Sequence, residues 1–168
     1  MSSWFYVNIG LKQGCLLSPV LFNLYINDLA CKIKSLNVGV RTQNDNVSIL
    51  MYADDLVFMA ESENDLQMML DTLNEWCITW GMNVNEQKTK VMHFRKHGKA
   101  CTKVDFSCGN KTIDVCSQYK YLGLMIDEFM DYDVTAKHVS KSAHRALGLL
   151  IAKDKAQGGF SYDIFTRL

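Results

Sequence analysis

The sequence predicts an α+β fold, in which short antiparallel hairpins pack against long helices. Three observations support this fold class. Two stretches place apolar residues at helical spacing over several turns, which is typical of helices that pack on a core. The stretch Val47–Ala60 places two short apolar runs on either side of a tight polar turn. Further short alternating segments flank turn residues later in the chain, which is typical of hairpins.

Length and composition exclude a disordered chain. The chain has 168 residues, 48% of them hydrophobic, which is enough to bury a core. Lys plus Arg and Asp plus Glu number 18 each, so the formal net charge is zero. Because free-standing nucleic-acid-binding proteins are usually basic, this balance argues against strong autonomous binding. Acidic residues nevertheless concentrate between Asp45 and Glu86, while the stretch from Lys88 to Lys103 is mostly basic.

The cysteines and the first residues bear on the compartment. None of the six cysteines belongs to a Cys-x-x-Cys pair or has a zinc-type histidine spacing, which predicts reduced, mostly buried thiols of an intracellular protein. Residues 1–8 lack the charged start and apolar core of a secretory signal. No apolar run approaches the length of a membrane span. We therefore expect a nuclear or cytoplasmic protein without a membrane partner. The six cysteines are Cys15, Cys31, Cys77, Cys101, Cys108 and Cys116.

The stretch Val47–Ala60 predicts a hairpin with two acids, Asp54 and Asp55, at its tip. Two ionised carboxylates about 4 Å apart repel by about 4 kcal/mol at an effective dielectric constant of about 20. A divalent cation would relieve this repulsion, and hard oxygen ligands suit Mg²⁺. For an isolated aspartate pair, a solvated turn is the commoner explanation. The neighbouring motifs must therefore decide between the two interpretations.

The first long helix is predicted to begin at Ser18-Pro19, with Ser18 as its N-cap and Pro19 at its first helical position. Trp4–Ile9 before it predicts a short strand, and the loop from Gly10 to Gly14 follows as a turn or a ligand-binding loop. The start of the helix is apolar on most sides, so we expect it to be buried. The helical face is formed by Phe22, Ile26, Leu29, Ile33 and Leu36, and the broad apolar start by Val20, Leu21, Leu24 and Tyr25.

The second long helix has the clearest boundaries. Ser62, with Asp65 three residues on, resembles a capping box, and Gly81 is a plausible C-terminal stop. The face between them is apolar over four turns. Core packing explains this face better than a ligand groove does. Its members are Leu66, Met69, Leu70, Leu73, Trp76, Cys77 and Trp80.

The remainder of the chain predicts short strands followed by another helix. Met82–Val84 and Val91–Phe94 are predicted strands, and Lys88 lies in the polar loop between them, either solvated or beside a phosphate site. Val104–Cys108 and Ile113–Val115 predict a second hairpin around a Gly-Asn turn, and Tyr119–Ile126 predicts a further strand. A helix from Asp133 to about Ala152 carries several basic residues, which either follow a phosphate backbone or are simply solvated. Another helix is predicted to start near Ser161.

Four motifs, read together, resemble successive motifs of reverse transcriptases, most closely those of the non-LTR (LINE-type) retrotransposon branch. They occur in the family's order and at about its spacing, between Phe5 and Gly123, and the helical tail fits the start of that family's thumb. The motifs are Gly10 to Asn23 (GLKQGCLLSPVLFN), Tyr52-Ala53-Asp54-Asp55, Trp80-Gly81-Met82 with Asn85, Lys88 and Thr89, and Tyr119-Lys120-Tyr121-Leu122-Gly123.

The resemblance implies an RNA-directed DNA polymerase that uses two Mg²⁺ ions, an RNA template, a DNA primer and deoxynucleoside triphosphates. It implies a palm with an antiparallel sheet and helices on one face, over residues 1–126, and the start of a helical thumb over residues 127–168. Asp54 would be a direct metal ligand and Asp55 a second one, beside Tyr52 in the substrate site. Gln13 and Gly14 would contact the template and the incoming nucleotide, and Lys88 would help to protonate the pyrophosphate. Tyr121, Leu122 and Gly123 would form the hairpin that positions the primer end.

One departure from the family pattern limits the expected activity. The family uses another aspartate, on a strand upstream of the glycine loop, whereas the first acid of this sequence, Asp28, is placed in a helix. We therefore expect a fragment, truncated at both ends and inactive by itself. The alternatives are a non-catalytic nucleic-acid-binding remnant and an interaction module whose acids are plain turn residues.

Overall fold

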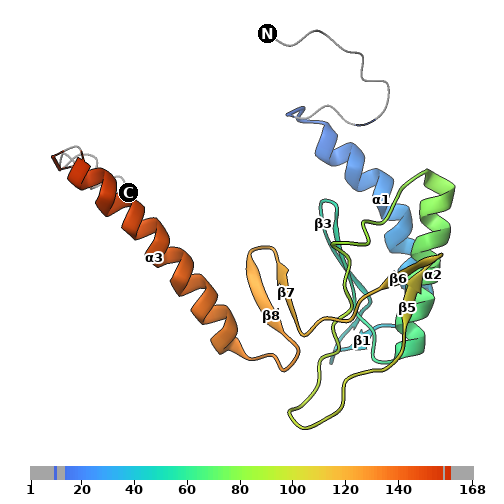
Figure 1. The fold of residues 1–168 in the computed structure, drawn as a ribbon. Helices are drawn as coiled ribbons and strands as arrows, with labels where there is room; N and C mark the ends of the chain where they lie inside the picture. Colours follow the sequence, from blue (N-terminus) through green and yellow to red (C-terminus); the bar gives the residue numbers. More distant parts are fainter. Residues whose placement is uncertain (1–9, 11–13, 157, 160–168) are drawn as a thin grey trace. The chain divides into compact units, whose positions relative to one another are not determined.

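The computed structural model describes Gly10, residues 14–156 and residues 158–159. Its helices are α1 (Ser18–Ser35), α2 (Glu63–Trp80) and α3 (Tyr132–Ala156), and Figure 1 traces their order along the chain. The predicted strand at Trp4–Ile9 and the predicted helix near Ser161 lie outside the described residues. The strands are β1 (Val40–Arg41), β2 (Asn46–Val47), β3 (Ile49–Tyr52), β4 (Asp55–Phe58), β5 (Phe106–Cys108), β6 (Lys111–Ile113), β7 (Gln118–Tyr121) and β8 (Leu124–Asp127).

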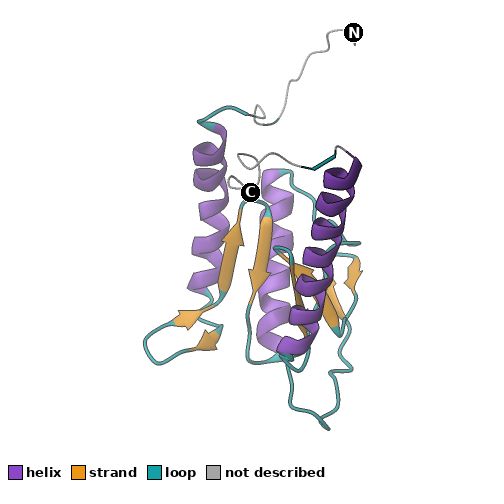
Figure 2. Cartoon of the chain, turned by 90° about the vertical axis from the view of Figure 1, so that its left-hand side faces the viewer, coloured by secondary structure: helices purple, strands orange, loops and turns teal. Residues whose placement is uncertain are grey.

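The mixture of helices and antiparallel strands confirms the α+β class. Within the described residues the strands form four two-stranded ribbons, β1–β2, β3–β4, β5–β6 and β7–β8, rather than one continuous sheet. Figure 2 draws the strands of these ribbons in orange and the helices in purple. None of the helices that the structure describes is both long and apolar enough to cross a membrane.

The chain divides into two compact units, each of which is described by itself. The first unit combines Met1–Thr89 with Val104–Ile113, and the second combines Lys90–Lys103 with Asp114–Leu168. The first unit therefore contains α1, α2 and the ribbons from β1 to β6. The second contains the β7–β8 ribbon and α3.

The core of the first unit lies between α1, α2 and the β5–β6 ribbon. α1 and α2 run side by side (Figure 1), and the apolar residues that recur along their facing sides are the ones that lose contact with water. One end of β3 and the alternate residues Phe106, Cys108 and Ile113 of β5–β6 add to this core. Its buried residues are Ile26, Leu29, Ala30, Ile33, Ile49, Met69, Leu70, Leu73, Trp76, Cys77, Phe106, Cys108 and Ile113.

The capping signals of α2 are confirmed. The side chain of Ser62 accepts a hydrogen bond from the backbone N–H of Asp65 at 3.1 Å. Gly81 ends the helix in the left-handed conformation, with φ at +66°. Trp80, at the last helical position, is 44% exposed and so is only partly in the core.

The start of α1 differs from the prediction in two ways. Ser18 is the first helical residue rather than the N-cap, because the helix is preceded by Leu17 in a helical conformation without a side-chain cap. The apolar residues near this end are exposed, so the prediction that they are buried on most sides was wrong. No described residue of this unit covers them, and burial on α1 begins only at Ile26. The exposed residues are Leu16, Leu17, Val20, Leu21 and Leu24.

The β5–β6 hairpin turns at Gly109-Asn110 as predicted, and a glutamine of α2 holds it in place. The Gln67 side chain donates to the backbone oxygen of Ser107 at 2.9 Å and accepts from the backbone N–H of Ser107 at 3.2 Å. The Gln67 amide thus satisfies both backbone groups of Ser107, as a neighbouring strand would. Lys111 also forms an ion pair with Glu86 at 2.7 Å.

The structure corrects three strand predictions, two of them in the second unit. Tyr119–Ile126 is a hairpin rather than one strand, with Tyr121 paired to Leu124 across a two-residue loop. Val91 makes an isolated parallel bridge to Val115 instead of starting a strand, and Met82–Val84 in the first unit is not a strand either. The glycine at position 123, inside an apolar run, was the signal for a turn.

A cluster around Phe129 ties the 90–103 loop to the end of the β7–β8 ribbon. Arg95 pairs with Glu128 at 2.8 Å, with both side chains largely buried, and its guanidinium lies 4.5 Å from the ring centre of Phe129. His97 stacks on that ring with 4.1 Å between centres. The following helix, α3, is attached to β8 by a hydrogen bond from the Thr135 hydroxyl to the backbone oxygen of Met125.

All six cysteines are free, as expected, but only Cys77 and Cys108 are buried. Burial raises the pKa of both thiols, and for Cys108 the negative charges of Cys77 and Asp71 add to this effect. Cys31 is exposed and the other three are half-buried.

Candidate active site at the acidic hairpin

The acidic hairpin has the predicted geometry. β3 and β4 pair antiparallel from Ile49–Phe58 at the base to Tyr52–Asp55 at the end, which leaves Ala53 and Asp54 as a two-residue loop. Asp54 therefore occupies the bend itself, and Asp55 is the first residue of the returning strand. Both side chains are exposed. The two acids are thus consecutive residues at the end of a ribbon, and both are open to a ligand.

Ala53 is the strained residue of this bend. Its φ is +52°, in the left-handed region that residues with a Cβ rarely adopt. Such a conformation costs on the order of 1 kcal/mol and persists only where the surrounding structure imposes it. Because non-glycine residues in this region are concentrated at ligand-binding and catalytic positions, the strain is consistent with a functional bend.

The hairpin is buried at its base and exposed toward its tip. Ile49 is 8% exposed, whereas Leu50 is 46% and Tyr52 is 65% exposed. The apolar side chains beside the acids are therefore available for contact with a substrate or with another part of a larger protein. Tyr52, predicted in the substrate site, stands directly before the bend.

The donor set of the tip suits Mg²⁺. Two exposed carboxylates offer only hard oxygen ligands, and Mg²⁺ is commonly held by one or two carboxylates while water and phosphate fill its other positions. Among the described residues, no group of three or more His, Cys, Asp or Glu side chains lies close enough together to hold a metal ion. Asp54 and Asp55 therefore fit a weak carboxylate site that leaves most of the coordination sphere to other groups.

The glycine loop before α1 is partly described. Gln13 lies outside the described residues. Gly14 has φ at +78°, which favours glycine, and apart from Gly14 and its chain neighbours no atom of the described residues lies within 4 Å of the position that a Cβ would take. The backbone at Gly14 is therefore open to close approach by a ligand. Next to it, a hydrogen bond from the backbone N–H of Leu17 lowers the pKa of the Cys15 thiol.

Lys88 lies in a tight turn built by Asn85. The Asn85 side-chain oxygen accepts the backbone N–H groups of Gln87 at 3.1 Å and Lys88 at 3.3 Å. The backbone oxygen of Asn85 also accepts the N–H of Thr89 at 2.9 Å. The predicted motif residues Asn85, Lys88 and Thr89 thus form one hydrogen-bonded loop, which fixes the backbone from which the exposed Lys88 side chain projects.

The predicted primer-positioning residues belong to the second compact unit. Leu122 and Gly123 form the two-residue loop between β7 and β8, with φ values of +46° and +87°. Leu122 is 50% exposed. This loop repeats the strained pattern of the acidic bend, with a bulky residue in the left-handed region.

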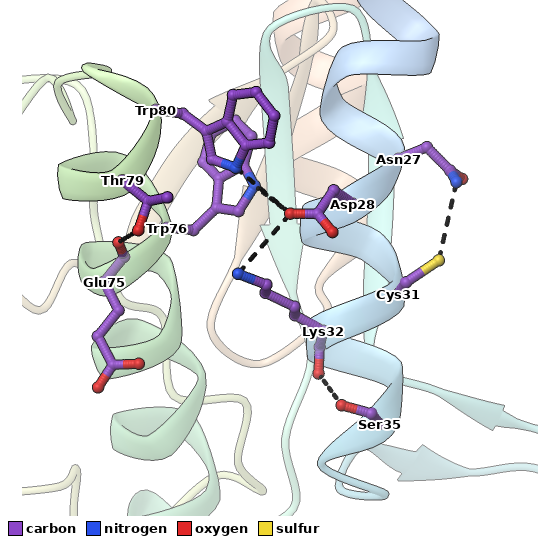
Figure 3. A network of polar contacts seen from close by, with 9 residues as sticks. All are labelled: Asn27, Asp28, Cys31, Lys32, Ser35, Glu75, Trp76, Thr79 and Trp80. Atoms are coloured by element: carbon purple, nitrogen blue, oxygen red, sulfur yellow. Dashed lines mark hydrogen bonds and ion pairs between the residues drawn. The ribbon is translucent and has the colours of Figure 1, made fainter.

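The structure also reveals a polar cluster between α1 and α2 that the sequence did not predict. Asp28 of α1 faces Trp76 and Trp80 of α2 and lies one turn before Lys32 (Figure 3). The sequence predicts only that Asp28 lies in a helix rather than at the end of a strand. The signal in the sequence that could have indicated this cluster is an acid in one predicted helix together with two tryptophans in another.

Comparisons with known proteins agree with the motif pattern. Residues 1–126 match the family described as "Reverse transcriptase (RNA-dependent DNA polymerase)". The chain is 25% identical over 149 residues to the RNA-directed DNA polymerase from mobile element jockey of Drosophila funebris, covering 85% of this chain and 15% of that protein. It is 32% identical over 122 residues to the Pol polyprotein of the retrotransposable element R2DM of Drosophila melanogaster, covering 68% of this chain and 11% of that protein.

A third relative is the probable RNA-directed DNA polymerase from transposon BS of Drosophila melanogaster. It is 26% identical over 144 residues, which cover 82% of this chain and 16% of that protein. The chain therefore spans less than a fifth of the length of each of these three relatives.

Proposed function

Because this chain belongs to the reverse transcriptase family, we propose that it supplies the acidic hairpin of an RNA-directed DNA polymerase from a non-LTR retrotransposon. Such an enzyme extends a DNA primer on an RNA template with deoxynucleoside triphosphates. The observation that carries the proposal is the pair of exposed carboxylates at a strained two-residue bend, inside the region that matches the family.

The proposed roles follow from the chemistry of each group. Asp54 and Asp55 hold Mg²⁺, which in such enzymes activates the attacking hydroxyl and stabilises the leaving oxygens. Gly14, together with Gln13, lets the template and the incoming nucleotide approach the backbone. Lys88 supplies positive charge or a proton to the pyrophosphate, and its turn is held rigid by Asn85. Tyr52 lines the substrate site.

We further propose that residues 1–126 form part of the palm and residues 127–168 the start of the thumb, with the loop of Tyr121, Leu122 and Gly123 holding the primer end. The two carboxylates do not complete a two-metal site, since Mg²⁺ prefers octahedral coordination and a pair of ions needs further bridging ligands. We therefore expect the chain by itself to polymerise poorly, and a larger protein that contributes another carboxylate to polymerise well.

A chimera tests this function. Residues 1–126 of this chain replace the matching region of the jockey polymerase, and extension of a DNA primer on an RNA template is measured with Mg²⁺. The chimera should extend the primer. Asp54→Asn should lower the rate about a thousandfold, because it removes a negatively charged metal ligand. Asp105→Asn, an exposed acid before β5, is the matched control and should leave the rate unchanged.

An inactive chimera whose parent enzyme is active would count against the proposal, and so would equal rates for Asp54→Asn and the control. Robust extension by the isolated 168-residue chain would contradict the expectation that it needs another carboxylate.

A second candidate function, a nucleic-acid-binding remnant, is favoured by α3. No residue of this helix is buried within the described range, and Lys137, Lys141 and His144 line a shallow depression along one side of it. Such a basic face suits a phosphate backbone. Binding of duplex RNA–DNA that weakens steeply with salt and survives Asp54→Asn in the inactive chain would favour this function over polymerisation.

A further inference from the structure

Asp28 joins two helices through a single carboxylate oxygen. Its Oδ2 atom accepts the indole N–H of Trp76 at 3.1 Å and that of Trp80 at 3.3 Å, as Figure 3 shows. A carboxylate only accepts hydrogen bonds and an indole N–H only donates them, so the three groups are complementary. Trp76 is 2% exposed, and its N–H has a partner in Asp28. Asp28 therefore satisfies a buried donor of the opposite helix.

Tyr25, one turn before Asp28, also contacts Trp80. Its hydroxyl donates to the backbone oxygen of Trp80 at 2.9 Å. The Tyr25 ring meets the indoles of Trp76 and Trp80 edge-on, with centres 5.6 Å and 5.1 Å apart. Trp80 is thus held at its N–H and its carbonyl by two residues of α1. We call Tyr25, Asp28, Trp76 and Trp80 the indole clasp.

The ion pair with Lys32 contributes much less to this cluster. Lys32 Nζ lies 3.7 Å from the same Asp28 oxygen, and both side chains are about half exposed, at 47% and 45%. Exposed pairs of this kind contribute little to stability because water and salt screen them. The two indole donors, rather than the lysine, fix the carboxylate.

The clasp lies where the burial of α1 begins among the described residues, counted from the glycine loop. The first buried residue of α1 is Ile26, and the exposed apolar residues Leu17, Leu21 and Leu24 precede it. Ser18 lies ten residues before Asp28, about 15 Å along the helix. A small tilt of α1 at the clasp therefore becomes a larger displacement at Gly14.

The clasp also fixes the place where the chain leaves α2. Trp80 is the last residue of α2, Gly81 turns the chain, and the backbone N–H of Met82 returns to the oxygen of Cys77 at 2.9 Å. The turn built by Asn85, which carries Lys88, follows within five residues. Gly14 lies in the segment before α1, and Lys88 lies in the segment after α2. Both segments are therefore attached to helices that the Asp28 carboxylate joins.

We propose that Asp28 is a positioning residue, which, by accepting the indole N–H groups of Trp76 and Trp80, sets the placement of Gly14 relative to the turn that carries Lys88. This placement matters for catalysis only if the proposed function holds, because the proposed function assigns both Gly14 and Lys88 to contact with the nucleotide. The structural part of the proposal can be measured without any nucleotide.

The test uses nuclear magnetic resonance of the ¹⁵N-labelled 168-residue chain. Asp28→Ala removes the acceptor, Asp28→Asn restores an acceptor oxygen without the charge, and Trp80→Phe keeps a ring but removes one donor. We expect Asp28→Ala to shift the Gly14 amide signal clearly, Trp80→Phe to shift it less, and Asp28→Asn to return it part of the way. If Asp28→Ala fails to fold, the milder Trp80→Phe decides the question.

Two controls separate positioning from general destabilisation. Gln67→Ala loosens the β5–β6 hairpin, and Gln67 lies near the start of α2, whereas Trp76 and Trp80 lie near its end. Even where its loss of stability equals that of Asp28→Ala, this variant should leave the Gly14 amide signal unchanged. Lys32→Ala removes only the ion pair and should also leave Gly14 unchanged. A Gly14 signal that stays in place while the indole signals of Trp76 and Trp80 move would overturn the proposal. Equal shifts with Gln67→Ala would overturn it too.

A titration of the jockey chimera with a deoxynucleoside triphosphate and Mg²⁺ then distinguishes the two proposals. If the chimera binds and Asp28→Ala in it raises the dissociation constant about tenfold, as expected for a misplaced contact, both stand. If Gly14 moves but no variant binds nucleotide, the positioning role stands and the proposed function loses support. If all variants bind equally and Gly14 does not move, the positioning role fails while the proposed function stands.

Discussion

Two hairpins of the first compact unit, β3–β4 and β5–β6, have the same arrangement of strands and loop but differ in burial. Each has two antiparallel strands joined by a two-residue loop. In β5–β6 the strand residues Phe106, Cys108 and Ile113 are all less than 5% exposed. In β3–β4 only Ile49 is buried, and Leu50 and Tyr52 are largely exposed. One hairpin is part of the core, and the other projects its tip into solvent.

The loops show the same contrast. The first loop position has a positive φ in both, +62° at Gly109 and +52° at Ala53. Glycine adopts this conformation without strain, whereas alanine does not. The buried β5–β6 hairpin therefore has an unstrained residue, Gly109, at this position. The β3–β4 hairpin, which carries the acids, has a strained one, Ala53. Strain and exposure coincide at the proposed site, which is what a bend shaped for a ligand rather than for stability would show.

The largest difference is expected from removing one large side chain on each hairpin. Phe106→Ala should lower the free energy of unfolding by about 3 to 5 kcal/mol, because it leaves a cavity in the core. Leu50→Ala on β3 should change it by less than about 1 kcal/mol, because the side chain is already half exposed. Urea denaturation measures both. Similar losses for the two variants would show that the hairpins are not packed differently.

Gln67→Ala should have the next largest effect, about 2 kcal/mol, because it leaves both backbone groups of Ser107 without their partner. Gln67→Glu is the informative companion. A carboxylate can accept from the Ser107 N–H but cannot donate to its oxygen, and it faces Asp71, which now accepts from Gln67 at 2.8 Å. Stability measured by urea denaturation should therefore not recover in Gln67→Glu. Full recovery would mean that the donated hydrogen bond does not hold the hairpin.

Gly109→Ala should destabilise by about 1 to 2 kcal/mol. The new Cβ would adopt a strained backbone conformation and would meet the Asn74 side-chain oxygen at 2.5 Å, so that Asn74 must move. Thermal unfolding measures the loss. The double variant with Asn74→Ala, which removes the obstructing amide, should retain only the backbone part of the loss.

Ala53→Gly should have the smallest effect and the opposite sign. Relieving the left-handed strain should stabilise the chain by about 0.5 to 1 kcal/mol, although the greater freedom of glycine in the unfolded chain offsets part of this gain. In the jockey chimera we expect the same change to lower primer extension, because the bend is held less firmly. Destabilisation by Ala53→Gly would contradict the assignment of strain to this bend.

Local signals predicted the parts of the fold that are decided by neighbouring residues. Ser62, Asp65 and Gly81 mark the ends of α2, and the apolar runs around Asp54 mark the acidic hairpin, because caps and turns depend on a few adjacent groups. The order of four motifs, rather than the aspartate pair alone, pointed to the reverse transcriptase family.

Contacts between distant segments could not be predicted in this way. Gln67 looks like an ordinary polar helix residue, and its pairing with Ser107 becomes visible only when the hairpin lies on α2. Asp28 likewise acquires its partners from residues about 50 positions away. The exposure of Leu24 on α1 also depends on which segments lie nearby, which helical periodicity does not specify.

The central claim, that the exposed acids at the β3–β4 bend form a metal site, is tested most directly by adding Mn²⁺ in place of Mg²⁺ to the ¹⁵N-labelled chain. Mn²⁺ accepts the same oxygen ligands, and its unpaired electrons broaden the signals of nearby amides. We predict selective broadening of the amides from Tyr52 to Leu56, which is lost in Asp54→Asn combined with Asp55→Asn. Broadening no stronger than at Asp105, or unchanged by the double substitution, would contradict the claim.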